Sequence, residues 1–420
     1  MSSVRRVLPA VLLLGLLASA CAAPAERPQG EGEQVELTVQ AAGGEGELTA
    51  LRELIAAYEA EHPGVTVAFT GVPNQGDHIA KLGTAFAGGN PPDVFLLNYR
   101  RLGPFVDRGV VAPVQLQELR EGDLYAPAVE AFTYDGQLAC LPQNVSSSVA
   151  YLNLALFEQA GLPLPEAEWT WADLEAAAKV LQTKGIAAVG YDAEIRTVAP
   201  FVWTAGGEVV DDTAAPTTMT LDGPQARRAL EYLDGLQQYG VDATARAAAE
   251  PAEQFAAGEL AVFFDSRRAV PAFRKSEGLR FDVRPLPRAD AARPSVSLLA
   301  SDAYCVAEDS DAPDAAAQFA EYAVAGAGAT VLARSGRTVP SLRSLAESDV
   351  FLDPQQQPES SRVFLDVIPT LRRLPNVGPQ DEAEEAANDL LAQYFAGKAD
   401  LDATVAAIRK ATAAAYGQRR

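Results

Sequence analysis

Residues 35–97 alternate short apolar runs with segments that carry apolar residues at helical spacing. Residues 35–39 alternate apolar and polar positions, as a strand with one buried face does, and residues 65–69 and 93–97 continue the series of strands. Between these strands, residues 48–58 and 77–87 have the periodicity of helices. This order predicts an α/β fold with a parallel sheet and right-handed crossovers.

A second unit of the same type begins near residue 145. Thr170 and Asp173 form a capping box at the start of a helix that ends at Gly185, and Pro224 stands at the first position of another helix. Further elements are predicted at residues 186–190, 261–264, 281–283, 303–306, 313–325, 383–396 and 402–416. Roughly 385 residues follow the N-terminal segments, too many for one core, so two domains are expected.

The N-terminus has the pattern of a bacterial lipoprotein signal. Arg5 and Arg6 precede an apolar run over residues 7–17, and small residues lead to Cys21. The run is about half as long as a spanning helix needs, so residues 1–20 are expected to be a cleaved signal peptide and residues 21–34 a tether. A cysteine in this setting resembles the lipobox, although Ala18 stands where lipoboxes most often carry leucine. We expect lipidation of Cys21, against simple secretion with an unmodified cysteine.

Charge and residue counts exclude several classes of function. The formal net charge is −22, which repels nucleic acid and anionic lipid headgroups. The chain has three cysteines and two histidines, too few for a disulfide scaffold, a thiolate zinc site or a Ser-His-Asp or Cys-His arrangement. We therefore expect no metal, no cofactor and no catalytic residue of these types, whereas carboxylate chemistry stays open.

Several motifs together resemble one family over nearly the whole mature chain. In chain order they are a turn before the third predicted strand (residues 89–94), a Leu-Pro pair (141–142), the segment Val-Ala-Tyr-Leu-Asn (149–153) and a segment ending in Ala-Gly-Leu (156–162). A tryptophan-flanked helix cap (169–174), a Gly-Gly-Glu turn (206–208) and a segment in which Ala-Gly precedes an apolar strand (255–262) follow. In this order they resemble the extracellular solute-binding proteins of carbohydrate ABC importers, the family that includes maltose-binding protein.

The resemblance implies a periplasmic-binding-protein-like fold with two α/β lobes joined by crossing segments. Lobe one is expected at residues 35–144 and 300–339, and lobe two at residues 145–299 and 340–420. Ligands of open α/β sheets bind beyond the carboxyl ends of the strands. The resemblance places these ends of both lobes at one cleft.

The resemblance also implies which loops face that cleft. In lobe one and at the first crossing the candidates for ligand contact are Gly43, Gly44, Glu45, Asn98, Tyr99, Arg100, Arg101, Gln143, Asn144 and Ser146. In lobe two and at the return crossing they are Glu194 and Arg196 (expected in a loop), Trp203 as a stacking plate, Ser266, Arg267, Arg268, Ser301 and Asp302. The alternatives are a tight turn for the glycines, solvated arginines, and helix packing for Trp203, as we expect for Trp169 and Trp171.

The two cysteines that remain after Cys21 are expected to be neighbours. In the family, the segment entering the first crossing and the strand after the return crossing lie side by side in lobe one. Cys140 lies in the former and Cys305 in the latter. They should be close in space, either as a disulfide, which an extracytoplasmic compartment permits, or as a buried thiol pair.

The resemblance implies a monomeric lipid-anchored binding protein, in the periplasm or on the cell surface. It would capture a sugar or sugar-like solute and deliver it to permease subunits that work with a cytoplasmic ATPase. Alternatives are a secreted carbohydrate-active enzyme with Glu45 and Glu194 as its carboxylates, and a lipoprotein that presents bound sugar to a receptor. The arginines at 100, 101, 267 and 268 leave room for an acidic sugar or a sugar phosphate.

Overall fold

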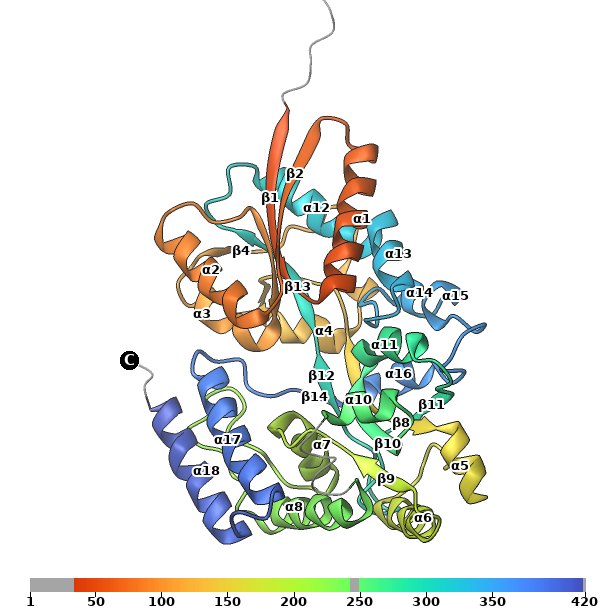
Figure 1. Ribbon diagram of the computed structural model, residues 1–420. Coiled ribbons are helices and arrows are strands. Elements are labelled where there is room, and N and C mark those ends of the chain that lie inside the picture. Colours follow the sequence, from red (N-terminus) through yellow and green to blue (C-terminus); the bar gives the residue numbers. More distant parts are fainter. Residues whose placement is uncertain (1–33, 242–248, 418–420) are drawn as a thin grey trace, which may run out of the picture. The chain divides into compact units, whose positions relative to one another are not determined.

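The structure is a computed structural model that describes residues 34–241 and 249–417. The expected signal peptide, the lipidation site Cys21 and the tether up to residue 33 lie outside the described residues. From Val35 onward the described residues form two six-stranded sheets with helices packed around them, and a small two-stranded sheet, β5 (Thr133–Tyr134) and β6 (Gln137–Leu138) (Figure 1).

The first sheet belongs to lobe one, and its central strands are parallel as the sequence predicts. Strand β1 pairs in parallel with β2 and with β3, and β13 pairs antiparallel with β3. Strand β7 joins the sheet through β13. Its strands, in the order in which they pair, are β2 (Val65–Val72), β1 (Val35–Ala42), β3 (Val94–Asn98), β13 (Asp302–Ala307) and β4 (Val111–Ala112), with β7 (Leu141–Pro142) beside β13.

The strand order places the two crossover helices on opposite faces of the first sheet. The chain moves from β1 to β2 on one side and then back past β1 to β3 on the other. Crossovers between parallel strands are right-handed as a rule, so two crossovers in opposite directions place their helices on opposite faces. Helix α1 (Glu45–Glu61) therefore covers one face and α2 (Gln75–Ala87) the other (Figure 1). The direction of winding reverses between β1 and β3, and ligands of open sheets bind at such a switch point.

The second sheet belongs to lobe two and is mixed. Strand β8 runs antiparallel to β10, β11 and β12, whereas β9 is parallel to β10. The amino end of β8 therefore meets the carboxyl ends of β9, β10 and β12 at one edge. The strands are β14 (Leu371–Arg372), β12 (Ser297–Ala300), β8 (Ser146–Asn153), β10 (Leu260–Ser266) and β9 (Ala187–Gly190), with β11 (Phe281–Arg284) beside β8.

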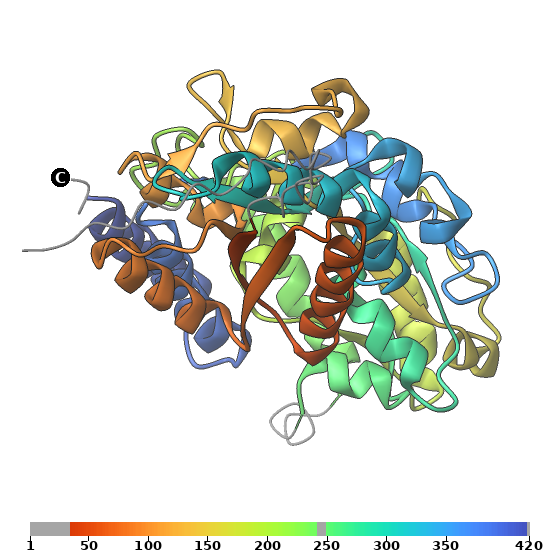
Figure 2. The ribbon, with the colours of Figure 1, turned by 90° about the horizontal axis from the view of Figure 1, so that it is seen from above.

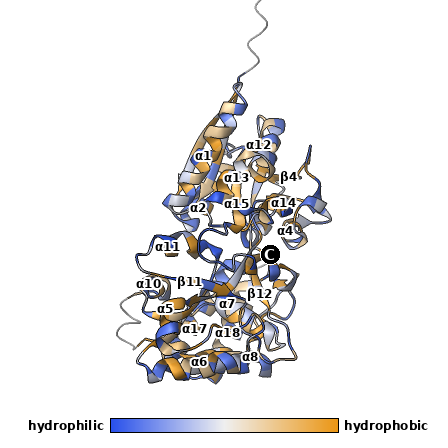
Figure 3. Ribbon diagram, turned by 90° about the vertical axis from the view of Figure 1, so that its right-hand side faces the viewer, coloured by the Kyte–Doolittle hydropathy of each residue, from blue (hydrophilic) through white to orange (hydrophobic). Residues whose placement is uncertain are grey.

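Helices with one apolar face pack against both sheets, and their polar and apolar positions alternate along the ribbons (Figure 3). Those of lobe one are α3 (Gly103–Val106), α4 (Ala126–Ala131), α12 (Pro313–Ala325) and α13 (Ala327–Arg334), besides α1 and α2. Further along the chain are α5 (Leu154–Ala160), α6 (Trp171–Thr183), α7 (Ile195–Thr204), α8 (Pro224–Leu236), α10 (Pro251–Ala256), α11 (Val270–Lys275), α14 (Arg343–Ala346), α15 (Asp349–Leu352), α16 (Val363–Asp366), α17 (Gln380–Phe395) and α18 (Leu401–Tyr416). Helices α17 and α18 lie side by side (Figures 1 and 2).

The capping box at the start of α6 forms as the sequence predicts. Thr170 accepts a hydrogen bond from the Asp173 backbone, and the Asp173 carboxylate accepts one from the Thr170 backbone. Trp169 and Trp171 are both 4% exposed. The Trp171 ring stacks on Tyr232 with 4.3 Å between centroids. Both tryptophans anchor this helix in the core of lobe two.

Three chain segments connect the two sheets and are hydrogen-bonded to one another. Val145 N donates to Val339 O over 2.9 Å, and Ser341 N donates to Gln143 O over 3.1 Å. Gln143 N also donates to Asp302 O over 2.8 Å. The first, return and third crossings thus run side by side. The strand order is compatible with the expected lobe limits, which stay a prediction.

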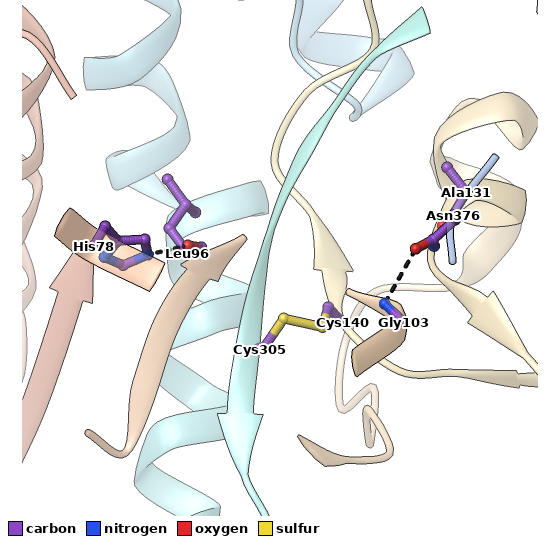
Figure 4. Close-up of a disulfide and its surroundings, with 7 residues drawn as sticks. All are labelled: His78, Leu96, Gly103, Ala131, Cys140, Cys305 and Asn376. Atoms are coloured by element: carbon purple, nitrogen blue, oxygen red, sulfur yellow. Dashed lines mark hydrogen bonds between the residues drawn. A yellow bond between two sulfur atoms is a disulfide. The ribbon is translucent and has the colours of Figure 1, made fainter. Parts of the chain in front are cut away.

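The cysteine pair lies in lobe one, as expected. Cys140 and Cys305 form a disulfide with Cα atoms 4.4 Å apart, although 165 residues separate them in sequence (Figure 4). Cys305 lies in β13, and Cys140 directly precedes β7. Both residues are fully buried. The disulfide therefore links the segment that enters the first crossing to the strand that follows the return crossing.

Across the described residues, no helix combines the length and the apolar composition that a membrane span requires.

Candidate functional site

A cavity of about 650 Å³ lies between the two six-stranded sheets, and its wall comes largely from strand ends and the loops that follow them. Its wall includes residues that follow β1 and β3 in lobe one, residues from the first and return crossings, and residues that follow β9 and β10 in lobe two. One face of α17 completes it. The cavity thus occupies the switch point of the first sheet and the matching edge of the second, where ligands of such sheets bind.

Glu47 occupies the wall after strand β1. Its side chain is 16% exposed and pairs with Arg337, with 2.9 Å between Oε2 and Nε. A Cβ atom added to Gly43 would stand 2.5 Å from Glu47 Oε2, so glycine is needed for the carboxylate to lie against the backbone. Burial raises the pKa of Glu47 to about 7, with Arg337 lowering it and Asp302 raising it further.

The turn after β3 carries two arginines that reach across the cavity. Residues Tyr99–Arg101 form one 3₁₀ turn. Arg100 pairs with Glu384 and Arg101 pairs with Asp381 over 2.7 Å, both acids lying on α17. The Glu384 residue is only 5% exposed. These ion pairs join lobe one to the C-terminal helices.

The crossings contribute a hydrogen-bonded polar group. Asp302 accepts hydrogen bonds from Asn98 Nδ2 over 3.0 Å and from Asn144 Nδ2 over 3.2 Å. Ser146 Oγ accepts from Val339 N over 3.2 Å. Amide and carboxylate groups held in this way are planar partners for paired hydroxyl groups.

The wall of lobe two carries carboxylates and arginines from two loops. Arg196 pairs with Glu194 over 2.6 Å, and Arg268 pairs with Asp265 over 3.1 Å. Asp192 lies on the same wall. Burial, together with the negative charges of Glu194 and Asp265, raises the pKa of Asp192 to about 6.

Two phenylalanines supply the aromatic part of the wall. Phe201 and Phe264 both line the cavity, with 5.3 Å between ring centroids. They are 1% and 5% exposed, so only their edges reach the surface. Aromatic rings in carbohydrate sites pack against apolar sugar faces. Phe264 lies within β10, two residues before its end, and was not among the contacts expected from the sequence.

The structure brings ten of the expected ligand contacts to the cavity wall: Asn98, Arg100, Arg101, Asn144, Ser146, Glu194, Arg196, Ser266, Arg268 and Asp302. Glu194 and Arg196 are not both in a loop as expected, because α7 begins at Ile195 and Arg196 lies in its first turn. The sequence pattern did not indicate this helix because Pro200 lies inside it, and proline is unfavourable within helices.

The remaining expected contacts lie away from the wall. Gly44 and Glu45 are exposed at the start of α1, whereas Tyr99, Gln143 and Ser301 are buried; Tyr99 accepts from Leu374 N, Gln143 donates to Tyr304, and Ser301 donates to Asn144 O. Since Glu45 does not line the cavity, it forms no glycosidase pair with Glu194 there.

Trp203 and Arg267 were expected to contact the ligand, but the structure places both side chains in the core. Trp203 is 6% exposed, packs within the core of lobe two and lies under the Arg372 guanidinium, 4.8 Å from its ring centroid. Arg267 is fully buried between the rings of Phe351 and Phe364 and donates to the carbonyls of Gly336 and Phe351. Neither residue lines the cavity.

Sequence reasoning missed several residues of the wall. They are Glu47, Asp192, Arg337 and the face of α17 formed by Asp381, Glu384, Glu385, Asn388 and Asp389. The spacing on α17 was a usable signal, because these positions recur every three to four residues opposite Ala383, Ala387 and Leu391. The same spacing is typical of a solvated acidic face, so by itself it does not single out these residues.

The two-lobe fold and the cavity at its switch point define a periplasmic-binding-protein-like molecule. The family model described as bacterial extracellular solute-binding protein matches residues 53–358, and the chain belongs to this family. The fold is that of the sugar-binding proteins of ABC importers. The family and its structural neighbours are binding proteins rather than enzymes.

Individual relatives share less than a third of their aligned residues with this chain. A binding protein of Brucella abortus is 28% identical over 204 residues, 46% of this chain and 49% of that protein. The sn-glycerol-3-phosphate-binding periplasmic protein of Agrobacterium fabrum is 25% identical over 43% of this chain and 44% of that protein. The chain thus spans about half the length of the curated relatives it matches. An ABC substrate-binding protein of Listeria monocytogenes, solved with cycloalternan, superimposes with a TM-score of 0.81 at 22% identity, over 91% of this chain and 99% of that one.

Proposed function

We propose that the protein is an extracytoplasmic lipoprotein that captures a sugar or sugar-like solute in the cavity and delivers it to the permease of an ABC importer. The observation that carries this proposal is the polar cavity at the switch point, in a chain of the solute-binding family. Permease subunits, driven by a cytoplasmic ATPase, are the proposed partners, and the protein acts as a monomer.

The proposed contacts are the expected residues that line the wall. The amides of Asn98 and Asn144 and the carboxylate of Asp302 offer planar hydrogen-bonding groups to paired hydroxyls. Arg101 adds a guanidinium whose Nη1 is buried without a hydrogen-bond partner in the described part of the chain. The small exposed part of Phe264 would pack against the apolar side of the sugar ring.

Capture requires closure of the lobes on the solute. The three crossings are the segments that would bend, because they alone carry the chain between the sheets within residues 140–342 of the described structure. A solute drives closure only through its preference for the closed form. Contacts from both lobes supply that preference, since the cavity wall draws on both.

Delivery at a membrane follows from the N-terminal signal. The basic start, the apolar run and Cys21 support a lipid anchor, with acyl chains that hold the protein at the periplasmic or outer cell surface. Replacing Cys21 by Ser should move the protein from the membrane to the soluble fraction. A wild-type protein that is already soluble, with a processed and unacylated terminus, would contradict the anchor.

A thermal-shift screen over neutral sugars, uronates, sugar phosphates and polyols tests solute capture. We expect at least one sugar to raise the melting temperature, and Asn144→Ala to abolish the shift with the fold intact. Glu277→Ala, a change at an exposed residue away from the cavity, is the matched control. Absence of any shift across the screen would contradict the proposal.

A further inference from the structure

One segment of lobe two contacts lobe one without being part of a crossing. It comprises residues 373–384, from the end of strand β14 into the first turns of helix α17, and is called the strap below. In Figure 1 it is the blue loop that leads to the start of α17. The strap contacts lobe one at a place where the chain itself does not pass between the lobes.

Both ends of the strap are fixed in lobe two. Strand β14, just before it, pairs in parallel with β12 of the second sheet, and Arg372 of that strand pairs with Glu208 over 2.6 Å. At the other end, Gln380 Oε1 accepts a hydrogen bond from Tyr416 Oη of α18 over 2.8 Å. If the lobes separate, the strap therefore moves with lobe two.

The middle of the strap is bound to lobe one through Asn376 (Figure 4). Asn376 Oδ1 accepts from Gly103 N over 3.1 Å, and the Asn376 carbonyl accepts from Tyr134 Oη over 2.8 Å. Asn376 Nδ2 donates to Ala131 O over 3.5 Å. A Cβ atom added to Gly103 would stand 2.9 Å from Tyr134 Oη, so glycine is needed where these segments meet. One asparagine thus joins α3, the end of α4 and the β5–β6 hairpin.

Two neighbouring residues of the strap add hydrogen bonds to lobe one. Leu374 N donates to Tyr99 Oη over 3.2 Å, and Arg373 Nη1 donates to Glu130 O over 3.0 Å. Tyr99 N in turn donates to Ser301 O at the return crossing over 3.1 Å. The strap is therefore bound to lobe one from the neighbourhood of the return crossing as far as α4.

The end of the strap forms part of the cavity wall. Asp381 and Glu384 of α17 pair with Arg101 and Arg100 of the turn after β3, and all four residues line the cavity. Opening the cavity on this side would have to part both ion pairs and the five hydrogen bonds of residues 373–376. We call it the α17 side of the cavity.

These contacts influence the equilibrium between open and closed arrangements of the lobes. They are made by groups of the chain itself, so they act whether or not a solute is bound, and they favour the arrangement in which they form. The same arrangement carries a cost, because Arg101 Nη1 and Asn144 Oδ1 are buried without a hydrogen-bond partner among the described residues. The two effects oppose each other, so the contacts can be released.

We propose that the strap holds the α17 side of the cavity shut before a solute binds, with Asn376 as the residue that fixes it to lobe one. Asn376 and Tyr134 act on the position of the lobes, since neither residue lines the cavity. The inference goes beyond the proposed function and does not depend on which solute is captured.

The distance between the lobes tests the strap without any solute. Lys81→Cys on α2 and Lys410→Cys on α18 are exposed sites for spin labels, and the two helices lie on the same side of the molecule in both views (Figures 1 and 2). The labels are placed in the Cys21→Ser chain, so that Cys21 takes none. Double electron–electron resonance should show one short distance, and Asn376→Ala should add a population at longer distance.

Matched variants make the result specific. Tyr134→Phe removes one hydroxyl from the strap contacts and should lengthen the distance in a smaller fraction of molecules. Asn90→Ala, the same substitution at an exposed asparagine outside the strap and the cavity, should leave the distances unchanged. Thermal unfolding checks that each variant folds, and Tyr134→Phe decides if Asn376→Ala does not. Unchanged distances in the strap variants, or an equal change in Asn90→Ala, would overturn the inference.

Binding kinetics with a sugar found in the thermal-shift screen give a second test. If Asn376→Ala lowers the closed fraction to about a third, the dissociation constant should rise about threefold. Association should become faster at the same time, because the cavity is open more often. Weaker binding with slower or unchanged association would overturn the inference, since damage to the site itself has that effect. Failure of every sugar to bind would contradict the proposed function, and the distances measured without solute would still decide the role of the strap.

Discussion

The two lobes pair their cavity arginines in different ways. In lobe one, Arg100 reaches Glu384, 284 residues away in the sequence and on α17. In lobe two, Arg196 and Arg268 pair with Glu194 and Asp265, two and three residues away in their own segments. One cavity thus contains both long-range and local ion pairs.

The two kinds of ion pair differ in how much they contribute to the stability of the fold. Glu384 is 5% exposed, so its pairing with Arg100 holds two buried charges, and losing either partner leaves the other unpaired. The Arg268 side chain is 45% exposed, and water already screens its contact with Asp265. The long-range pairs therefore stabilise the fold, whereas the local pairs set the charge that the solute meets.

The largest expected effect concerns the covalent link of lobe one. The double variant Cys140→Ser/Cys305→Ser should lose about 4 kcal/mol of unfolding free energy, because the disulfide closes a long loop in the unfolded chain. Urea unfolding of the variant, and of the wild type with and without reductant, measures this. A wild type that is equally stable when reduced would show that lobe one does not depend on the link.

The second effect is on the long-range pair. Glu384→Ala should cost about 3 to 4 kcal/mol, because Arg100 is left as a buried, unpaired guanidinium. Arg362→Ala is the control, since its pair with Asp366 has side chains 65% and 58% exposed and such pairs contribute less than about 1 kcal/mol. Similar losses in both variants, measured by urea unfolding, would remove the distinction between the two kinds of pair.

The third effect depends on pH and arises at Glu47. Its pKa is about 7 in the folded protein and 4.5 for the free side chain, so the folded state binds more protons between these values. Stability from this group is complete below pH 4.5 and is lost as the pH rises through 7, by about 3 kcal/mol. Glu47→Gln should remove this part of the decline. Parallel stability curves for variant and wild type from pH 4.5 to 8 would contradict the expectation.

The smallest effect is expected at a local pair. Asp265→Asn should change the unfolding free energy by less than about 1 kcal/mol, because the Arg268 side chain is 45% exposed and remains in contact with water when its partner is neutral. A loss comparable to that of Glu384→Ala would mean that lobe two also relies on its arginine pairs.

Elements with a regular local pattern could be predicted from the sequence. The parallel order of β1, β2 and β3, the capping box at Thr170 and the helix at Pro224 all follow from spacing and local hydrogen bonding, and the structure confirms them. The neighbourhood of the two cysteines followed from the family resemblance. About a third of the wall, ten of its thirty residues, could be placed in the same way, because these residues lie at strand ends, in the loops that follow strands or at the crossings.

The rest depends on contacts between distant segments. Whether an arginine after β10 turns to the cavity or the core is decided by Phe351 and Phe364, some 84 and 97 residues later, so Arg267 and Arg268 cannot be told apart locally. Trp203 likewise looks like a stacking plate until the core of lobe two surrounds it. The acidic face of α17 can be assigned to the cavity wall only once the fold shows that Glu384 pairs with Arg100.

The placement of the disulfide has a topological consequence. Cys140 stands just before the first crossing and Cys305 just after the return crossing. The disulfide therefore closes the chain between these two residues into a covalent ring. A single backbone cut anywhere between these cysteines opens the ring without separating the pieces. A protease-nicked molecule should therefore migrate as one species in denaturing electrophoresis until a reductant is added, and only then as two.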